Sequence, residues 1–100
     1  MNAIHAQPAE PWTVATLAAR SGLSRAAFAG RFNELVGRPP LAYLSWWRMT
    51  LAGRELQTRD APLSAIARRV GYASEFAFGK AFKRDYGVSP GSYRRRIIPD

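Results

Sequence analysis

Residues 24–32 read Ser-Arg-Ala-Ala-Phe-Ala-Gly-Arg-Phe, and residues 74–82 read Ser-Glu-Phe-Ala-Phe-Gly-Lys-Ala-Phe. The two stretches align at a spacing of fifty positions, and the match continues downstream: Ser24, Phe28, Phe32, Gly37, Pro40 and Tyr43 recur as Ser74, Phe78, Phe82, Gly87, Pro90 and Tyr93. Upstream the spacing is forty-nine, where Leu17-Ala18 and Gly22 match Ile66-Ala67 and Gly71. A register kept this long, with one slip placed in a turn, indicates an internal repeat of one supersecondary unit.

The first repeat has the pattern of a short helix, a turn and a longer helix. Thr13 is a suitable N-cap for a helix over residues 14–20, and Gly22 has the conformational freedom for a tight turn. Ser24 then caps a helix that runs to about Val36, where a glycine and two prolines follow. These signals predict a helix-turn-helix.

The second repeat has the same pattern. Pro62 suits the first position of a helix over residues 63–69, and Gly71 turns the chain. Ser74 caps a longer helix that Gly87 ends, and a short last helix opens three residues later. A long helix over about 41–58 joins the repeats and is expected to fix their spacing, with an apolar face at Leu41, Leu44, Leu51, Ala52 and Leu56.

The predicted organisation therefore has five parts. Residues 1–11 are a clipped first helix and a linker, 12–40 the first helix-turn-helix, 41–58 the linker helix, 59–96 the second helix-turn-helix with its short C-terminal helix, and 97–100 a tail. The fold class is all-α, with two helix-turn-helix subdomains on a linker helix.

Each longer helix must bury one face and expose the other. The expected buried faces are Phe28, Phe32, Leu35 and Val36 in the first unit, and Phe78, Phe82 and Tyr86 in the second. The outward faces are Ala26, Ala29, Gly30 and Asn33, with Arg25 at the entrance, and Phe76, Gly79, Lys80 and Lys83, with Glu75 at the entrance. Small residues allow close approach to a groove floor and apolar contact with thymine methyls, which is unusual for a solvated helix.

The charge favours a polyanionic partner. There are 15 Lys and Arg against 7 Asp and Glu, a net charge of +8, and thirteen of the basic residues are Arg. Arginine suits phosphates and guanine edges. A membrane surface is less expected, because no helix is basic on one face and strongly apolar on the other. The absence of cysteine excludes disulfides and thiolate metal sites and fits a reducing cytoplasm.

Several residues allow two interpretations. Phe76 contacts a base or sugar, or folds back onto a neighbour. Lys80 and Lys83 fit guanine or phosphate equally well, and Asn33 either binds adenine or is solvated. We assign DNA-backbone contacts to Ser24, Arg31, Ser74, Arg84, Arg94, Arg95 and Arg96, although the last three could be a frayed tail.

The linker helix carries two adjacent tryptophans that cannot face the same core. Trp47 is expected to pack, whereas Trp46 is either merely exposed or marks a surface for another domain or subunit. Arg48 is expected to anchor buried carbonyls or a carboxylate. Arg68 and Arg69 end a short helix, where cations suit the helix dipole without any DNA.

The residues from Trp12 to Arg96 resemble the C-terminal DNA-binding domain of AraC/XylS-type transcription regulators. The most specific stretches are Ile66-Ala-Arg-Arg-Val-Gly-Tyr72 and Phe82-Lys-Arg-Asp-Tyr-Gly-Val-Ser-Pro90. The resemblance implies about seven helices, two of which enter major grooves of promoter DNA, and usually activation through RNA polymerase. It implies base reading by the two outward faces given above. Gly30 and Gly79-Lys80 replace residues that are often Arg and Ser-Arg in the family, which weakens bidentate readout.

The family commonly carries an effector-binding domain ahead of this one, and its contact is expected near Trp46. No cofactor or metal is expected. An enzyme is excluded because the only histidine, His5, lies in a segment that is expected to be loose, without a nucleophile or carboxylate partner. A pure protein-interaction module is the rival hypothesis. We expect a cytoplasmic, nucleoid-associated monomer on an asymmetric site with half-sites about 10 base pairs apart.

Overall fold

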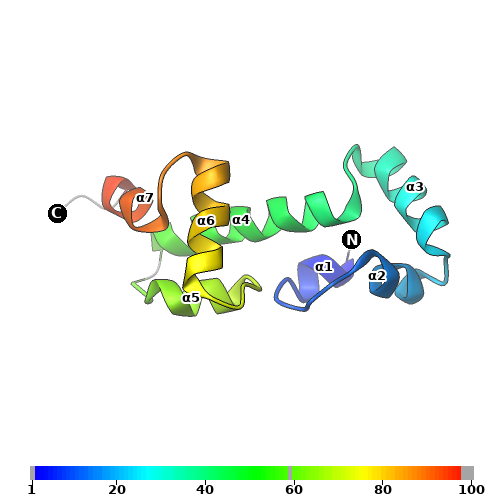
Figure 1. Cartoon of the computed structure of the whole chain (residues 1–100), viewed down its shortest axis with the longest axis horizontal. Coiled ribbons are helices and arrows are strands. Elements are labelled where there is room, and N and C mark those ends of the chain that lie inside the picture. The colour runs from blue at the N-terminus through cyan, green and yellow to red at the C-terminus, as the bar shows by residue number, and fades with distance from the viewer. Residues whose placement is uncertain (1, 59, 98–100) are drawn as a thin grey trace. The chain divides into compact units, whose positions relative to one another are not determined.

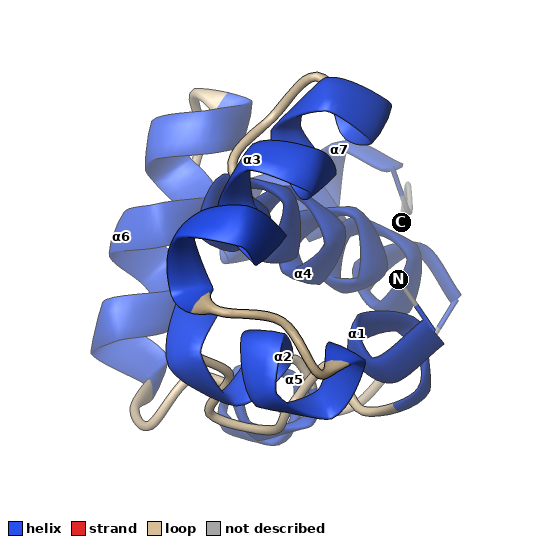
Figure 2. Cartoon of the chain, turned by 90° about the vertical axis from the view of Figure 1, so that its right-hand side faces the viewer, coloured by secondary structure: helices blue, strands red, loops and turns tan. Residues whose placement is uncertain are grey.

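The computed structural model describes residues 2–58 and 60–97. Within them the chain forms seven helices and no strand (Figures 1 and 2): α1 (Asn2–Ala6), α2 (Val14–Ser21), α3 (Arg25–Val36), α4 (Pro40–Thr58), α5 (Leu63–Arg69), α6 (Glu75–Tyr86) and α7 (Pro90–Ile97). The predicted all-helical class is confirmed. Apart from Ile97, the predicted tail lies outside the described residues.

The chain divides into two compact units, Met1–Trp47 and Arg48–Asp100. The boundary falls inside α4, so one continuous helix supplies residues to both. Each unit contains one helix-turn-helix, α2–α3 in the first and α5–α6 in the second. The repeat seen in the sequence is therefore a repeat of structure.

The caps of the first helix-turn-helix are those that the sequence predicts. Thr13 and Thr16 form a reciprocal capping box at the start of α2. Gly22 ends α2 with φ 72°, a left-handed conformation that side chains with a Cβ rarely adopt. Ser24 Oγ accepts a hydrogen bond from the Ala27 amide at 3.2 Å and begins α3, which ends at Gly37.

The second helix-turn-helix has the same serine and glycine caps on its longer helix, whereas both caps of α5 differ from those of α2. Ser74 Oγ accepts from the Ala77 amide at 3.0 Å, and Gly87 ends α6. The placement of Pro62 at the first helical position is wrong by one residue. Its carbonyl accepts from the amides of Ala65 and Ile66, and its ψ of 148° is extended, so Pro62 is the N-cap of α5.

The first unit has a core of aromatic and aliphatic side chains that includes the opening segment. The buried members are Ile4, Trp12, Leu17, Phe32, Tyr43 and Leu44. His5 is not in a loose segment as predicted, because its Nε2 lies 2.7 Å from Tyr43 Oη and its ring stacks on Trp47 at 4.4 Å. The packing prediction for Trp47 is confirmed.

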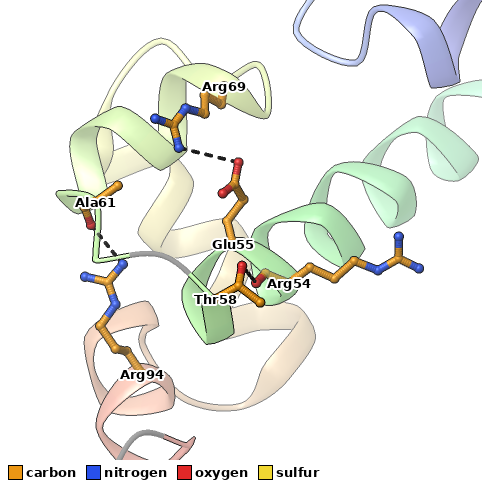
Figure 3. Close-up of polar contacts among 6 residues, drawn as sticks. All are labelled: Arg54, Glu55, Thr58, Ala61, Arg69 and Arg94. Atoms are coloured by element: carbon orange, nitrogen blue, oxygen red, sulfur yellow. Dashed lines mark hydrogen bonds and ion pairs between the residues drawn. The ribbon is translucent and has the colours of Figure 1, made fainter.

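The second unit has a larger core drawn from α4, α5 and α6. Its buried members are Met49, Ala52, Leu56, Ile66, Ala67, Val70, Phe78, Ala81 and Phe82. Polar contacts at the edge tie the elements together (Figure 3). Arg69 Nη1 of α5 lies 3.5 Å from Glu55 Oε1 of α4, and Arg94 Nη2 of α7 donates a hydrogen bond to the Ala61 carbonyl oxygen at 2.8 Å.

Two apolar residues are not where the periodicity placed them. Leu35 was expected in the buried face of α3, but it is 85% exposed. Leu41 was expected in the apolar face of α4, but it is exposed at the first turn of that helix. Leu35 falls between Phe32 and Val36, and the first unit buries Phe32 but Val36 only in part. The core of the first unit therefore covers only part of the apolar face predicted for α3.

Candidate nucleic-acid interface

The outward face of α3 is small and uncharged apart from its entrance. Arg25, Ala26, Gly30 and Asn33 are exposed, and Ala29 is half-buried. A Cβ added at Gly30 would meet nothing within 4 Å. The backbone of α3 can therefore come close to a flat partner surface along this face. It offers hydrogen-bonding side chains only at Arg25 and Asn33.

The outward face of α6 is larger and positively charged. Phe76 is 76% exposed, so it does not fold back onto a neighbour. Lys80 lies one turn further along the same face, and its Nζ is 5.5 Å from the Phe76 ring centroid. Glu75 and Lys83 are exposed, and half-buried Gly79 has open space above it. On this exposed helix the Phe76 ring can make apolar contact while the neighbouring Lys80 ammonium donates hydrogen bonds.

The two serine caps present a donor at the start of each of these helices. In each case the hydroxyl oxygen accepts from a backbone amide, of Ala27 for Ser24 and of Ala77 for Ser74. The hydroxyl hydrogen remains available to an acceptor outside the helix. A helix N-terminus with free amides and a hydroxyl donor suits a phosphate oxygen.

The arginines assigned to DNA-backbone contact fall into two groups. Arg31, Arg84, Arg95 and Arg96 are exposed. Arg84 Nε donates to Asp85 Oδ1 at 3.0 Å, and this hydrogen bond raises the pKa of Arg84 above its ordinary value. Arg94 differs, since its half-buried guanidinium is bound to the Ala61 carbonyl inside the second unit (Figure 3).

Arg48 lies over an aromatic ring. Its Cζ is 5.9 Å from the Tyr72 centroid, and a Cβ at Gly71 would come within 2.8 Å of its guanidinium. Gly71 has φ 100°, so glycine is needed there both for the turn and for this close approach. Burial lowers the pKa of Arg48. Sequence reasoning missed this contact, although a glycine beside a tyrosine in a turn is the signal that could have indicated it.

Trp46 is 43% exposed, which both of its interpretations require. Arg38 lies over its ring at 5.4 Å, and the two residues line a shallow hollow of about 170 Å³ with Val36 and Tyr43.

Within residues 2–58 and 60–97, His, Asp and Glu side chains form no group of three that could hold a metal ion. No helix in that part of the chain is long and apolar enough to cross a membrane.

Comparison with known proteins gives consistent matches. A family model described as a helix-turn-helix domain matches residues 17–96. A putative AraC-like transcription regulator of Streptomyces antibioticus is 49% identical over 96 residues, which are 96% of this chain and 32% of that protein. The RCS-specific HTH-type transcriptional activator RclR of Escherichia coli is 43% identical over 90 residues, which are 90% of this chain and 32% of that protein.

A solved structure is also similar over almost the whole chain. The DNA-binding domain of AdpA, a global transcriptional factor, in complex with a target DNA, aligns with a TM-score of 0.90 and 36% identity. The alignment covers 99% of this chain and 92% of that one. The chain therefore matches a DNA-binding domain over almost its full length, but it spans only 31 to 32% of the first curated relatives.

Proposed function

Because this chain belongs to the AraC-type helix-turn-helix family, we propose that it binds double-stranded DNA with sequence preference, as the DNA-binding part of a transcription regulator. Helices α3 and α6, called the reading helices below, each enter a major groove. The observation that carries the proposal is the outward face of α6, where an exposed phenylalanine and a lysine lie side by side. The proposed function is binding and includes no catalytic step.

The two reading helices have different roles in this proposal. The first offers Ala26, Ala29 and Gly30, which have no side-chain hydrogen bonds to give, so it senses groove shape and thymine methyls with help from Arg25 and Asn33. The second offers Lys80 and Lys83 as donors and holds the sharper preference. Phosphates are bound by Ser24, Arg31, Ser74, Arg84, Arg95 and Arg96.

Single-base variants of a preferred site test this division. Lys80→Ala is expected to relax base preference in the second half-site, where a good contact discriminates by about 1–3 kcal/mol. Ala29→Ser, a matched change on the first reading helix, is expected to alter selectivity little. Affinities measured on a panel of duplexes decide the matter. A larger cost for base changes in the first half-site would contradict the ranking.

We further propose that the chain serves as an activator within a longer regulator, with RNA polymerase as a partner and an effector domain against the surface around Trp46. The observation behind the second contact is that Trp46 is exposed beside a hollow. Trp46→Ala in the longer protein is expected to reduce effector-dependent transcription and to leave DNA affinity unchanged. Loss of both in parallel would refute a separate contact. DNA binding would place the protein at the bacterial nucleoid.

A further inference from the structure

The last turn of α6 meets α4 at a glycine. Tyr86 Oη donates a hydrogen bond to the Met49 carbonyl at 2.8 Å, although the two residues are 37 positions apart. Gly53, one turn after Met49, is buried directly beneath the phenol. A Cβ added at Gly53 would lie 2.5 Å from Tyr86 Oη and 3.3 Å from its Cζ. The hydrogen bond between Tyr86 and Met49 therefore requires that residue 53 has no side chain.

The ring of Tyr86 is held on its other sides by aromatic neighbours. It stacks on Phe82 with centroids 4.0 Å apart and planes 3° apart, and it meets Tyr93 edge-on at 5.1 Å. Burial raises the pKa of Tyr86, so the phenol stays protonated, and able to donate, over a wider pH range than an exposed tyrosine. The phenol cannot swing away from Gly53 without breaking this stack, so α6 itself would have to move.

Movement of α6 matters because Phe76 and Lys80 lie on the same helix. A helix of 12 residues is about 18 Å long. A shift at its C-terminal end therefore re-aims the exposed side chains nearer its start. Base readout depends on hydrogen bonds with narrow distance and angle limits.

The internal repeat offers a comparison within the same chain. At a spacing of fifty positions, Tyr86 corresponds to Val36, the last residue of α3. Valine has no group that donates a hydrogen bond, and Val36 borders the hollow of about 170 Å³ instead of stacking on a ring. A side-chain hydrogen bond from the last residue of the reading helix is therefore found in the second unit and not at the equivalent position of the first.

We propose that Gly53 and Tyr86 are positioning residues that set the orientation of the second reading helix against α4 and so determine base preference in the second half-site. This inference rests on the proposed function of α6. Neither residue lies on the outward face of α6, so their effect is transmitted through the backbone of that helix.

Gly53→Ala is the direct test. Alanine has a higher helix propensity than glycine, so the substitution would stabilise α4 if no clash existed. With the clash, discrimination among base pairs of the second half-site is expected to fall by about 5- to 150-fold, the range for losing one good contact. Discrimination in the first half-site and affinity for random duplex at low salt are expected to stay near wild-type values. Gly91→Ala in α7 is the matched control, because its Cβ would meet only Arg95 at an ordinary 3.5 Å.

The double variant Gly53→Ala/Tyr86→Phe distinguishes positioning from general damage. Phenylalanine removes the Oη atom that would lie 2.5 Å from the new Cβ and leaves the nearest ring carbon at 3.3 Å. The double variant is therefore expected to regain thermal stability and second half-site discrimination relative to Gly53→Ala, up to the level of Tyr86→Phe alone, because both variants lack the hydrogen bond to Met49. If Gly53→Ala does not fold, Tyr86→Phe alone must still lower discrimination in the second half-site more than in the first.

Three results would overturn the inference: wild-type discrimination in Gly53→Ala, no recovery in the double variant, or equal losses in both half-sites with Tyr86→Phe. Failure of the proposed function has a separate signature, because the wild-type chain would then select no preferred site. In that case the stability recovery of the double variant still reports on the contact itself.

Discussion

Replacing Phe78 with alanine is expected to remove a large part of the stability of the second unit. Phe78 is fully buried among the side chains of α4, α5 and α6, and its ring centroid lies 6.0 Å from that of Tyr72 and 5.8 Å from that of Phe82. Truncating such a residue costs about 3–5 kcal/mol, because apolar burial is lost and a cavity remains. Small domains are stable by only about 5–15 kcal/mol in total.

The matched control for this change is Phe76→Ala, which removes the same ring from the same helix two residues away. Phe76 is 76% exposed, so its loss is expected to change the free energy of unfolding by no more than about 0.5 kcal/mol. Urea unfolding followed by circular dichroism measures both variants. Equal destabilisation would mean that α6 does not bury the face described above.

A steep loss of DNA affinity with added salt is the second large effect that we expect. If about six to eight phosphates are neutralised, the slope of log affinity against log salt is about −5 to −7, which amounts to about a thousandfold or more between 50 and 200 mM salt. The basis is a net charge of +8 with exposed Arg31, Arg84, Arg95 and Arg96. Fluorescence anisotropy at several salt concentrations gives the slope.

Removing two of these arginines tests their role. Arg95→Ala with Arg96→Ala is expected to flatten the slope by about two and to weaken binding to all sequences alike, since each phosphate contact contributes about 0.9 to the slope. Arg69→Ala, which removes an arginine paired with Glu55, serves as the control and is expected to leave the slope unchanged. A slope that stays the same in the double variant would show that the end of α7 does not contact DNA.

Local signals in the sequence were sufficient to predict the helices. The caps at Thr13, Ser24 and Ser74 and the left-handed glycines Gly22 and Gly37 depend on neighbours within a turn of the chain. The internal repeat further predicted that the two units share one helix-turn-helix arrangement. The orientation of Phe76 also followed from helical spacing, because the residues two and six positions later occupy the opposite, buried face.

Contacts between distant segments could not be predicted in the same way. Leu35 is apolar and falls at a helical spacing that suits burial, but it is exposed in the structure. His5 was expected to be loose, because its partner Tyr43 is 38 residues away. The approach of Tyr86 to Gly53 has no local signal at all, since a glycine inside a helix has many possible causes.

Competition between a selected site and random duplex DNA tests the central claim most directly. Preferred sites are first chosen from a random pool, and the affinities of the wild-type chain for the best site and for a scrambled duplex are then measured at physiological salt. The selected site is expected to be bound at least about a thousandfold more tightly than the scrambled duplex. Equal, weak affinities for both duplexes would contradict it and would favour a protein-interaction module of high positive charge.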